Sequence, residues 1–109
     1  MAYDAAMADR IRAALETEPG VTEKKMFGGL AFLVDGRMAV AAGSGGVMLL
    51  RVPPDETDEQ LQRPGAEPFV MRGREMTGWI GVRPDALAGD DDLEAFVRTG
   101  VQYARTLTP

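Results

Sequence analysis

An Asp-Gly pair at positions 35–36, set between two apolar runs, restricts the fold more than any other feature of the chain. The apolar runs cover residues 30–34 and 37–42. A two-residue hairpin turn needs positive φ at both central positions, and Asp and Gly tolerate that conformation. The pattern predicts a β-hairpin and therefore an antiparallel sheet at the centre of the fold.

Further strands are expected on both sides of this hairpin. Residues 21–27 precede it, residues 47–52 follow it, and residues 68–71 and 77–82 lie later in the chain. The Gly-Ser-Gly-Gly segment at 43–46 has the composition of a phosphate-binding loop. Such a loop opens a helix and carries Lys-Ser or Lys-Thr, whereas this one leads into an apolar strand. We therefore interpret it as the connection of a second hairpin.

Helices are predicted at the two ends of the chain. Apolar residues recur at spacings of three and four over residues 4–18 and again from residue 93 to the end. Asp4 is expected to cap the first helix, and Asp90 or Asp91 the last one. Gly100, inside the last helix, indicates close packing against a neighbour, because glycine weakens a helix by about 1 kcal/mol relative to alanine. A short, polar, exposed helix is predicted over residues 55–63.

The order of helix, strands, short helix, strands and helix predicts an α+β fold in one domain that spans residues 1–109. We expect a two-layer sandwich, with an antiparallel sheet of about five to six strands and the N- and C-terminal helices on one face. The strands are apolar on both faces, so the second face is left exposed unless a partner covers it.

The chain contains neither cysteine nor histidine. This excludes disulfides, thiolate zinc sites and cysteine or histidine catalysis, and the cytoplasm becomes the expected location. We predict no enzymatic activity, no catalytic residues and no cofactor or metal. The acidic run at 90–92 lacks the ligand spacing of a calcium loop and is explained by helix capping. No apolar run is long enough to span a membrane.

The net charge of −5 disfavours nucleic acid as a partner, because nucleic-acid binding requires a basic surface. The bases are unevenly distributed, and several fall in the predicted strands. A candidate binding surface consists of Lys24, Lys25, Arg37, Arg51, Arg72, Arg74 and Trp79. The alternative is a set of solvated charges at strand edges, where lysine also prevents unwanted pairing. Trp79 alternates with the apolar residues that follow it, so it is expected on the second sheet face, in a protein interface rather than against a base.

The sequence resembles the N-terminal domain of the TfoX/Sxy family of competence regulators. The resemblance is carried by Lys-Lys-Met-Phe-Gly-Gly-Leu-Ala-Phe at 24–32, Asp-Gly-Arg-Met at 35–38, Leu-Arg-Val at 50–52, Pro-Phe at 68–69 and Gly-Val-Gln-Tyr-Ala at 100–104. The signature residues are Met26, Phe27, Gly28, Gly29, Asp35 and Gly36, to which we assign structural roles. Full-length regulators carry a second, C-terminal domain, so the chain is expected to be a stand-alone, single-domain member.

The resemblance implies a two-layer α+β fold related to secretion-chaperone-like domains. It also implies a regulatory or binding role rather than catalysis.

Three functions follow, in order of preference. The first is a non-enzymatic module that acts through contacts with a protein partner, including a second copy of itself. The second is a nucleic-acid-associated transcriptional or competence regulator that uses the basic strand region. The third is a small enzyme that uses carboxylate or arginine chemistry.

Overall fold

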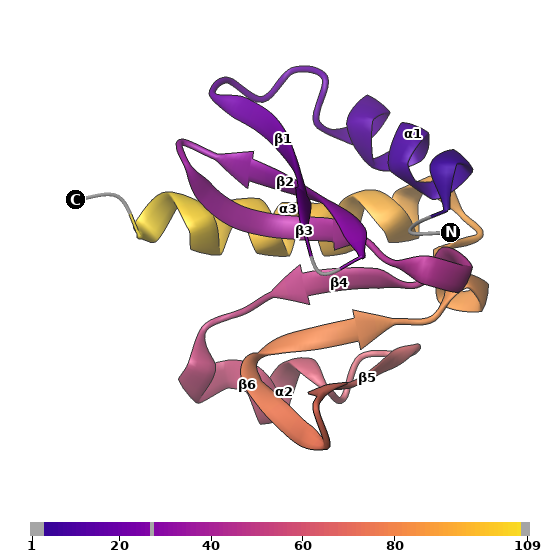
Figure 1. The fold of residues 1–109 in the computed structure, drawn as a ribbon, viewed down its shortest axis with the longest axis vertical. Coiled ribbons are helices and arrows are strands. Elements are labelled where there is room, and N and C mark those ends of the chain that lie inside the picture. Colours follow the sequence, from indigo (N-terminus) through magenta and orange to yellow (C-terminus); the bar gives the residue numbers. More distant parts are fainter. Residues whose placement is uncertain (1–3, 27, 108–109) are drawn as a thin grey trace.

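The computed structural model describes residues 4–26 and 28–107 and contains a six-stranded antiparallel sheet, with helices at both ends of the chain (Figure 1). The strand order is β1-β2-β3-β4-β6-β5. The strands are β1 (Val21–Met26), β2 (Gly29–Val34), β3 (Arg37–Ala42), β4 (Met48–Arg51), β5 (Ala66–Met71) and β6 (Arg74–Val82). The α-helices are α1 (Ala5–Ala14), α2 (Thr57–Gln60) and α3 (Asp90–Thr106), and the 3-10 turns are η1 (Ser44–Gly46), η2 (Pro54–Glu56) and η3 (Pro84–Leu87). The predicted α+β fold class is confirmed.

Two hairpins are closed by two-residue turns in which both residues have positive φ. In the β2–β3 turn, φ is 51° at Asp35 and 82° at Gly36. In the β5–β6 turn, φ is 54° at Arg72 and 76° at Gly73. These values match the turn type whose twist suits a hairpin. The predicted Asp-Gly hairpin is therefore confirmed, and the glycine-rich segment at 43–46 connects β3 to β4 through η1.

The helices α1 and α3 cover one face of the sheet, and α3 runs behind the strands in Figure 1. Cross-strand partners on this face form a continuous apolar row, because paired residues in an antiparallel sheet point to the same side. One such row is Phe32, Val40, Leu50 and Ile80, and each of these side chains is fully buried. The helices contribute further core residues, including Ile11, Phe96 and Val101.

Gly100 brings α3 close to the sheet. A Cβ atom at this position would lie 2.5 Å from the carbonyl oxygen of Ala39 and 2.9 Å from Cδ1 of Leu50. Only glycine allows the helix backbone this near to β3. The close packing predicted from the sequence is confirmed.

Two predicted helix ends differ from the structure. The first helix ends at Ala14 and not at residue 18, because the chain turns after Leu15 and the backbone N–H of Glu18 bonds to the carbonyl of Leu15. The residue before Pro19 is also disfavoured in a helix. The last helix is capped by Gly89, without a side-chain bond, so the prediction of an aspartate cap was wrong. The three aspartates at 90–92 occupy the first turn of α3, where negative charge complements the helix dipole.

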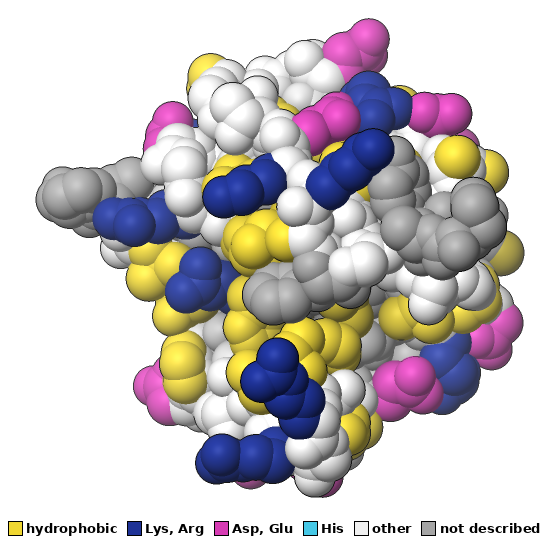
Figure 2. Space-filling model, viewed as in Figure 1, with side chains coloured by type: hydrophobic (Ala, Val, Ile, Leu, Met, Phe, Trp, Pro, Cys, Tyr) yellow, Lys and Arg dark blue, Asp and Glu magenta, His cyan; other side chains and the backbone are white. Residues whose placement is uncertain are grey.

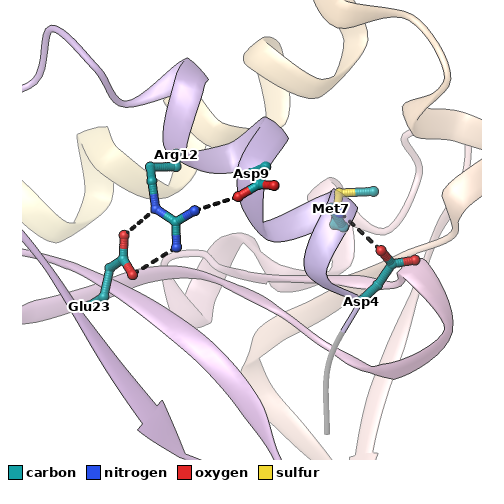
Figure 3. A network of polar contacts seen from close by, with 5 residues as sticks. All are labelled: Asp4, Met7, Asp9, Arg12 and Glu23. Atoms are coloured by element: carbon teal, nitrogen blue, oxygen red, sulfur yellow. Dashed lines mark hydrogen bonds and ion pairs between the residues drawn. The ribbon is translucent and has the colours of Figure 1, made fainter. Parts of the chain in front are cut away.

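A polar network joins α1 to the edge strand β1 (Figure 3). The Arg12 guanidinium donates to both carboxylate oxygens of Glu23, at 2.6 and 2.9 Å, and to Asp9 at 2.6 Å. At the start of α1, the Asp4 carboxylate accepts from the backbone N–H of Met7, which confirms Asp4 as the cap. The hydrogen bonds from Arg12 hold the pKa of Glu23 below its usual value.

Glu23→Gln is expected to lower the thermal midpoint at pH 7, and the difference from the wild type should start to shrink as the pH falls below about 4, near the usual carboxyl pKa. A carboxylate whose pKa is lowered by folding stabilises the fold above its unfolded-state pKa, and this stabilisation disappears as the pH falls through the folded-state pKa. Melting curves of the wild type and the variant from pH 3 to pH 7 measure the difference. A gap between the two proteins that is constant with pH would contradict this assignment.

Candidate binding surface

The face of the sheet opposite α1 and α3, here called the open face, is defined by a second row of cross-strand partners. Paired residues run from Lys24 of β1 to Glu67 of β5, and all point away from the helices. The complete row is Lys24, Ala31, Ala41, Leu49, Gly81 and Glu67. This face fills the foreground of Figure 2, with α3 behind it.

The open face carries a band of apolar side chains. Leu33, Met38 and Leu49 are half-buried, and Ala31 and Ala41 lie buried between their neighbours. Figure 2 shows hydrophobic side chains across the middle of this face, with separate Lys and Arg side chains among them and most of the acids toward the margins. A half-exposed apolar band with a basic surround is typical of a protein interaction surface.

A hollow of about 300 Å³ lies at the β5 side of the open face. It forms where Gly81 leaves a gap in the row between Leu49 and Glu67. Its walls are mixed: Val47, Phe69 and the 55% exposed Val70 are apolar, whereas Ser44 and Glu67 are polar. The hollow has the size and lining to hold an apolar side chain.

Arg51 ends β4, two residues beyond the Leu49 that lines this hollow, and its guanidinium lies near two aromatic rings. Its guanidinium carbon lies 5.7 Å from the ring centre of Trp79, its cross-strand partner on β6, and 5.8 Å from that of Tyr103 on α3. Both distances are within the range of cation–π attraction. All three side chains are half-buried. Within residues 4–26 and 28–107, no hydrogen bond or ion pair engages the guanidinium of Arg51, so its N–H groups remain available.

The other predicted basic residues do not gather around Arg51. Lys24 lies on the open face, whereas Lys25 is paired with Leu30 and faces the helix side. Arg37 donates to the carbonyl of Leu107 at 3.1 Å, which ties the start of β3 to the end of α3. Arg72 occupies the β5–β6 turn and Arg74 begins β6, and both are exposed. Of the predicted set, the structure brings together Arg51 and Trp79.

The signature residues lie along the first two hairpins. Met26 ends β1 half-buried, and Gly28 has a φ of 71° in the connection to β2. Gly29 lies against the carbonyl of Ala42, where a Cβ atom would be only 2.5 Å from the oxygen. The carboxylate of Asp35 pairs with Arg105 at 3.3 Å, and Gly36 completes the hairpin turn. Phe27 is outside the described residues.

A second hollow, of about 290 Å³, lies between α2 and the β5–β6 hairpin. Its lining combines Trp79, Phe69 and Leu61 with the carboxylates of Asp55 and Asp58. The sequence did not indicate this feature, because the hollow forms only where two distant segments meet. The backbone N–H of Gly78 donates a hydrogen bond to Oγ1 of Thr57 and thereby joins β6 to α2.

Two further findings concern ligands and membranes. Across the described ranges, no three acidic side chains come close enough together to hold a metal ion. No helix in this part of the chain has both the length and the hydrophobicity needed to cross a bilayer.

The architecture defines a small α+β domain with one sheet face that neither α1 nor α3 covers. The chain belongs to the TfoX N-terminal domain family, whose model matches residues 13–104. The predicted resemblance is thus confirmed, and this family is not a known enzyme family. A crystal structure of a protein from Pseudomonas syringae has a similar fold, with a TM-score of 0.59 and 14% sequence identity over 89% of this chain and 97% of that one. No curated protein matches the sequence.

Proposed function

We propose that this protein is a non-enzymatic binding or regulatory module that acts through protein contacts at the open face. The observation that carries the proposal is the apolar band of Leu33, Met38 and Leu49, which neither terminal helix covers. Monomeric proteins rarely leave a contiguous apolar band on a sheet face without a partner. The lack of histidine and cysteine in the sequence also favours binding over catalysis.

Self-association is one form of such contact. A second copy would place one open face against another and cover both apolar bands. An isologous arrangement of this kind is the commonest route to a homodimer.

The second candidate function is a nucleic-acid-associated transcriptional or competence regulator. The observation that favours it is the placement of Lys24 and Arg51 on the open face, with Arg72 and Arg74 at the nearby hairpin. The acidic net charge of −5 opposes it, because binding to a polyanion would have to overcome repulsion from the rest of the chain.

A photo-crosslinking amino acid at Leu33, introduced in the full chain and irradiated in cells, tests these alternatives. We expect crosslinks to one or a few defined proteins, or to a second copy of this chain, that survive nuclease treatment. The matched control is the same amino acid at Glu94, an exposed position on α3 away from the open face.

Equal crosslinking from both positions, or none from Leu33, would contradict the proposal. Crosslinks to nucleic acid that disappear with nuclease would favour the second candidate. Light scattering at high concentration, compared for the wild type and Leu33→Asp, separates self-association from binding to another protein. A strict monomer for the wild type would remove the homodimer.

A further inference from the structure

We infer that Arg51 and the hollow at Leu49, two residues before it on β4, form a binding site for an extended, acidic and apolar segment of a partner protein. Arg51 would hold a carboxylate, and the hollow over Gly81 would hold an apolar side chain. This inference rests on the proposed function and specifies the chemistry of the partner.

The first argument is the state of the Arg51 guanidinium. A guanidinium presents five N–H donors in a planar fork that matches a carboxylate, and its flat faces stack on aromatic rings. Trp79 and Tyr103 provide such rings at 5.7 and 5.8 Å and thereby restrict the orientation of the fork. A preorganised side chain loses less conformational freedom when it binds.

The second argument is the contrast with other arginines. Arg12, Arg37, Arg63 and Arg83 all donate hydrogen bonds to the protein itself. Arg51 is half-buried like Arg37 and Arg63, yet nothing in the described ranges accepts a hydrogen bond from it. A half-buried guanidinium that is stacked but not hydrogen-bonded keeps all of its N–H donors available to an anion.

The third argument is spacing. Arg51 and Leu49 are two residues apart on β4 and are paired with Trp79 and Gly81 on β6. Positions i and i+2 of a strand point to the same face and are about 7 Å apart. An extended peptide has the same repeat, so a carboxylate on one residue and an apolar side chain two residues away would reach Arg51 and the hollow together.

Charge complementarity favours a peptide over a nucleic acid as the occupant. Lys24 and Arg51 lie in the same face and attract an acidic segment, and the carboxylate of Glu67 lies at the hollow, where the inference places an apolar side chain and not a charge. The chain as a whole carries 17 acidic and 12 basic residues, which repels a long polyanion more strongly than a short peptide. The hollow, with Val47, Leu49, Phe69 and Val70 in its walls and Glu67 at its edge strand, also matches a leucine or phenylalanine side chain better than a sugar-phosphate backbone.

Titration of the isotope-labelled full chain with synthetic peptides tests the inference. The first peptide repeats Leu-Ser-Glu-Ser, which places Leu and Glu two residues apart on one face. The second peptide has Lys in place of Glu, and the third has Ser in place of Leu. We expect the Leu/Glu peptide to bind at least ~10-fold more tightly than the other two, and to shift the amide signals of Leu49, Arg51 and Gly81.

Arg51→Gln is expected to weaken binding of the Leu/Glu peptide at least ~10-fold, since it removes a charge-assisted pair. Arg98→Gln on α3 makes the same change in charge at an exposed position and should alter the affinity less than ~2-fold. Gly81→Val is a second variant, which fills the hollow. A Cβ atom there makes ordinary contacts of 3.7 Å with Glu67 and Val47, so we expect the variant to fold with a narrower hollow.

Equal effects of Arg51→Gln and Arg98→Gln would overturn the inference, because they would indicate diffuse electrostatic attraction. Equal binding of the Leu/Lys peptide, or no binding of any peptide, would also overturn it. Tighter, Arg51-dependent binding of a single-stranded oligonucleotide would assign the site to nucleic acid instead. Crosslinking from Leu33 remains informative in each case, so failure of this site is distinguishable from failure of the proposed function.

Discussion

Phe32→Ala is expected to lower the free energy of unfolding by about 3–5 kcal/mol. Phe32 is the largest fully buried side chain among residues 4–26 and 28–107, and it lies in the middle of β2. It belongs to the row of cross-strand partners that faces the helices, beside Val40, and the Arg12 guanidinium lies 5.9 Å from its ring centre. Truncation to alanine loses the transfer free energy of the ring and leaves a cavity in a layer that strands and helices both line.

The loss is large compared with the total stability of a small domain, which is about 5–15 kcal/mol. Urea unfolding followed by circular dichroism measures it. Phe32→Leu retains most of the apolar volume and should cost only roughly 1–2 kcal/mol, which keeps the measurement possible if the alanine variant does not fold. Phe69→Ala makes the same chemical change at a half-buried position near the sheet edge, where we expect roughly 1 kcal/mol.

Equal losses at Phe32 and Phe69 would mean that Phe32 does not occupy the centre of the core. The comparison also tests the assignment of the two sheet faces. A residue on the open face is already partly in contact with water, so its truncation removes less buried area than truncation on the helix side.

The strands and turns were predictable because their signals are local. The Asp-Gly turn and the apolar runs around it correspond to β2 and β3 in the structure. The beginning of β6 was less predictable, since it starts at Arg74 and not at residue 77. Residues 74–77 are polar or exposed, and they become a strand because they pair with β5 across a tight turn. Pairing of this kind depends on a neighbour that a single segment does not specify.

The candidate site was only partly predictable, for a similar reason. The sequence indicated which basic residues occur in strands, but their grouping depends on register and on the ends of the sheet. Lys24 and Lys25 are adjacent in sequence and face opposite sides of β1. Arg51 and Tyr103 are far apart in sequence and meet because α3 ends near the end of β4. The hollow beside Leu49 arises because Gly81 of another strand is its partner.

Gly100→Ala is expected to lower the free energy of unfolding by about 1–3 kcal/mol, although alanine is the better helix former. The added methyl group would lie 2.5 Å from the carbonyl oxygen of Ala39, 2.9 Å from Leu50 and 3.0 Å from Val40. The nearest of these atoms belongs to the backbone of β3 and cannot move without displacing the strand. Relief therefore requires α3 to shift away from the sheet, which loosens contacts along the central core row.

Gln102 provides the matched control, because it is exposed on the same helix. At that position alanine should be more stable than glycine by about 1 kcal/mol, which measures the intrinsic preference of α3 alone. A loss of stability on Gly100→Ala, opposite to the gain that alanine gives over glycine at position 102, would measure the steric effect of the close approach of α3 to β3. If Gly100→Ala instead stabilised the protein by a similar amount, α3 would have to pack farther from β3 than it does in this structure. The same urea titration shows whether Gly100→Ala lowers or raises the free energy of unfolding. Gly100→Val should lower it further, because its branched side chain reaches farther into the strand.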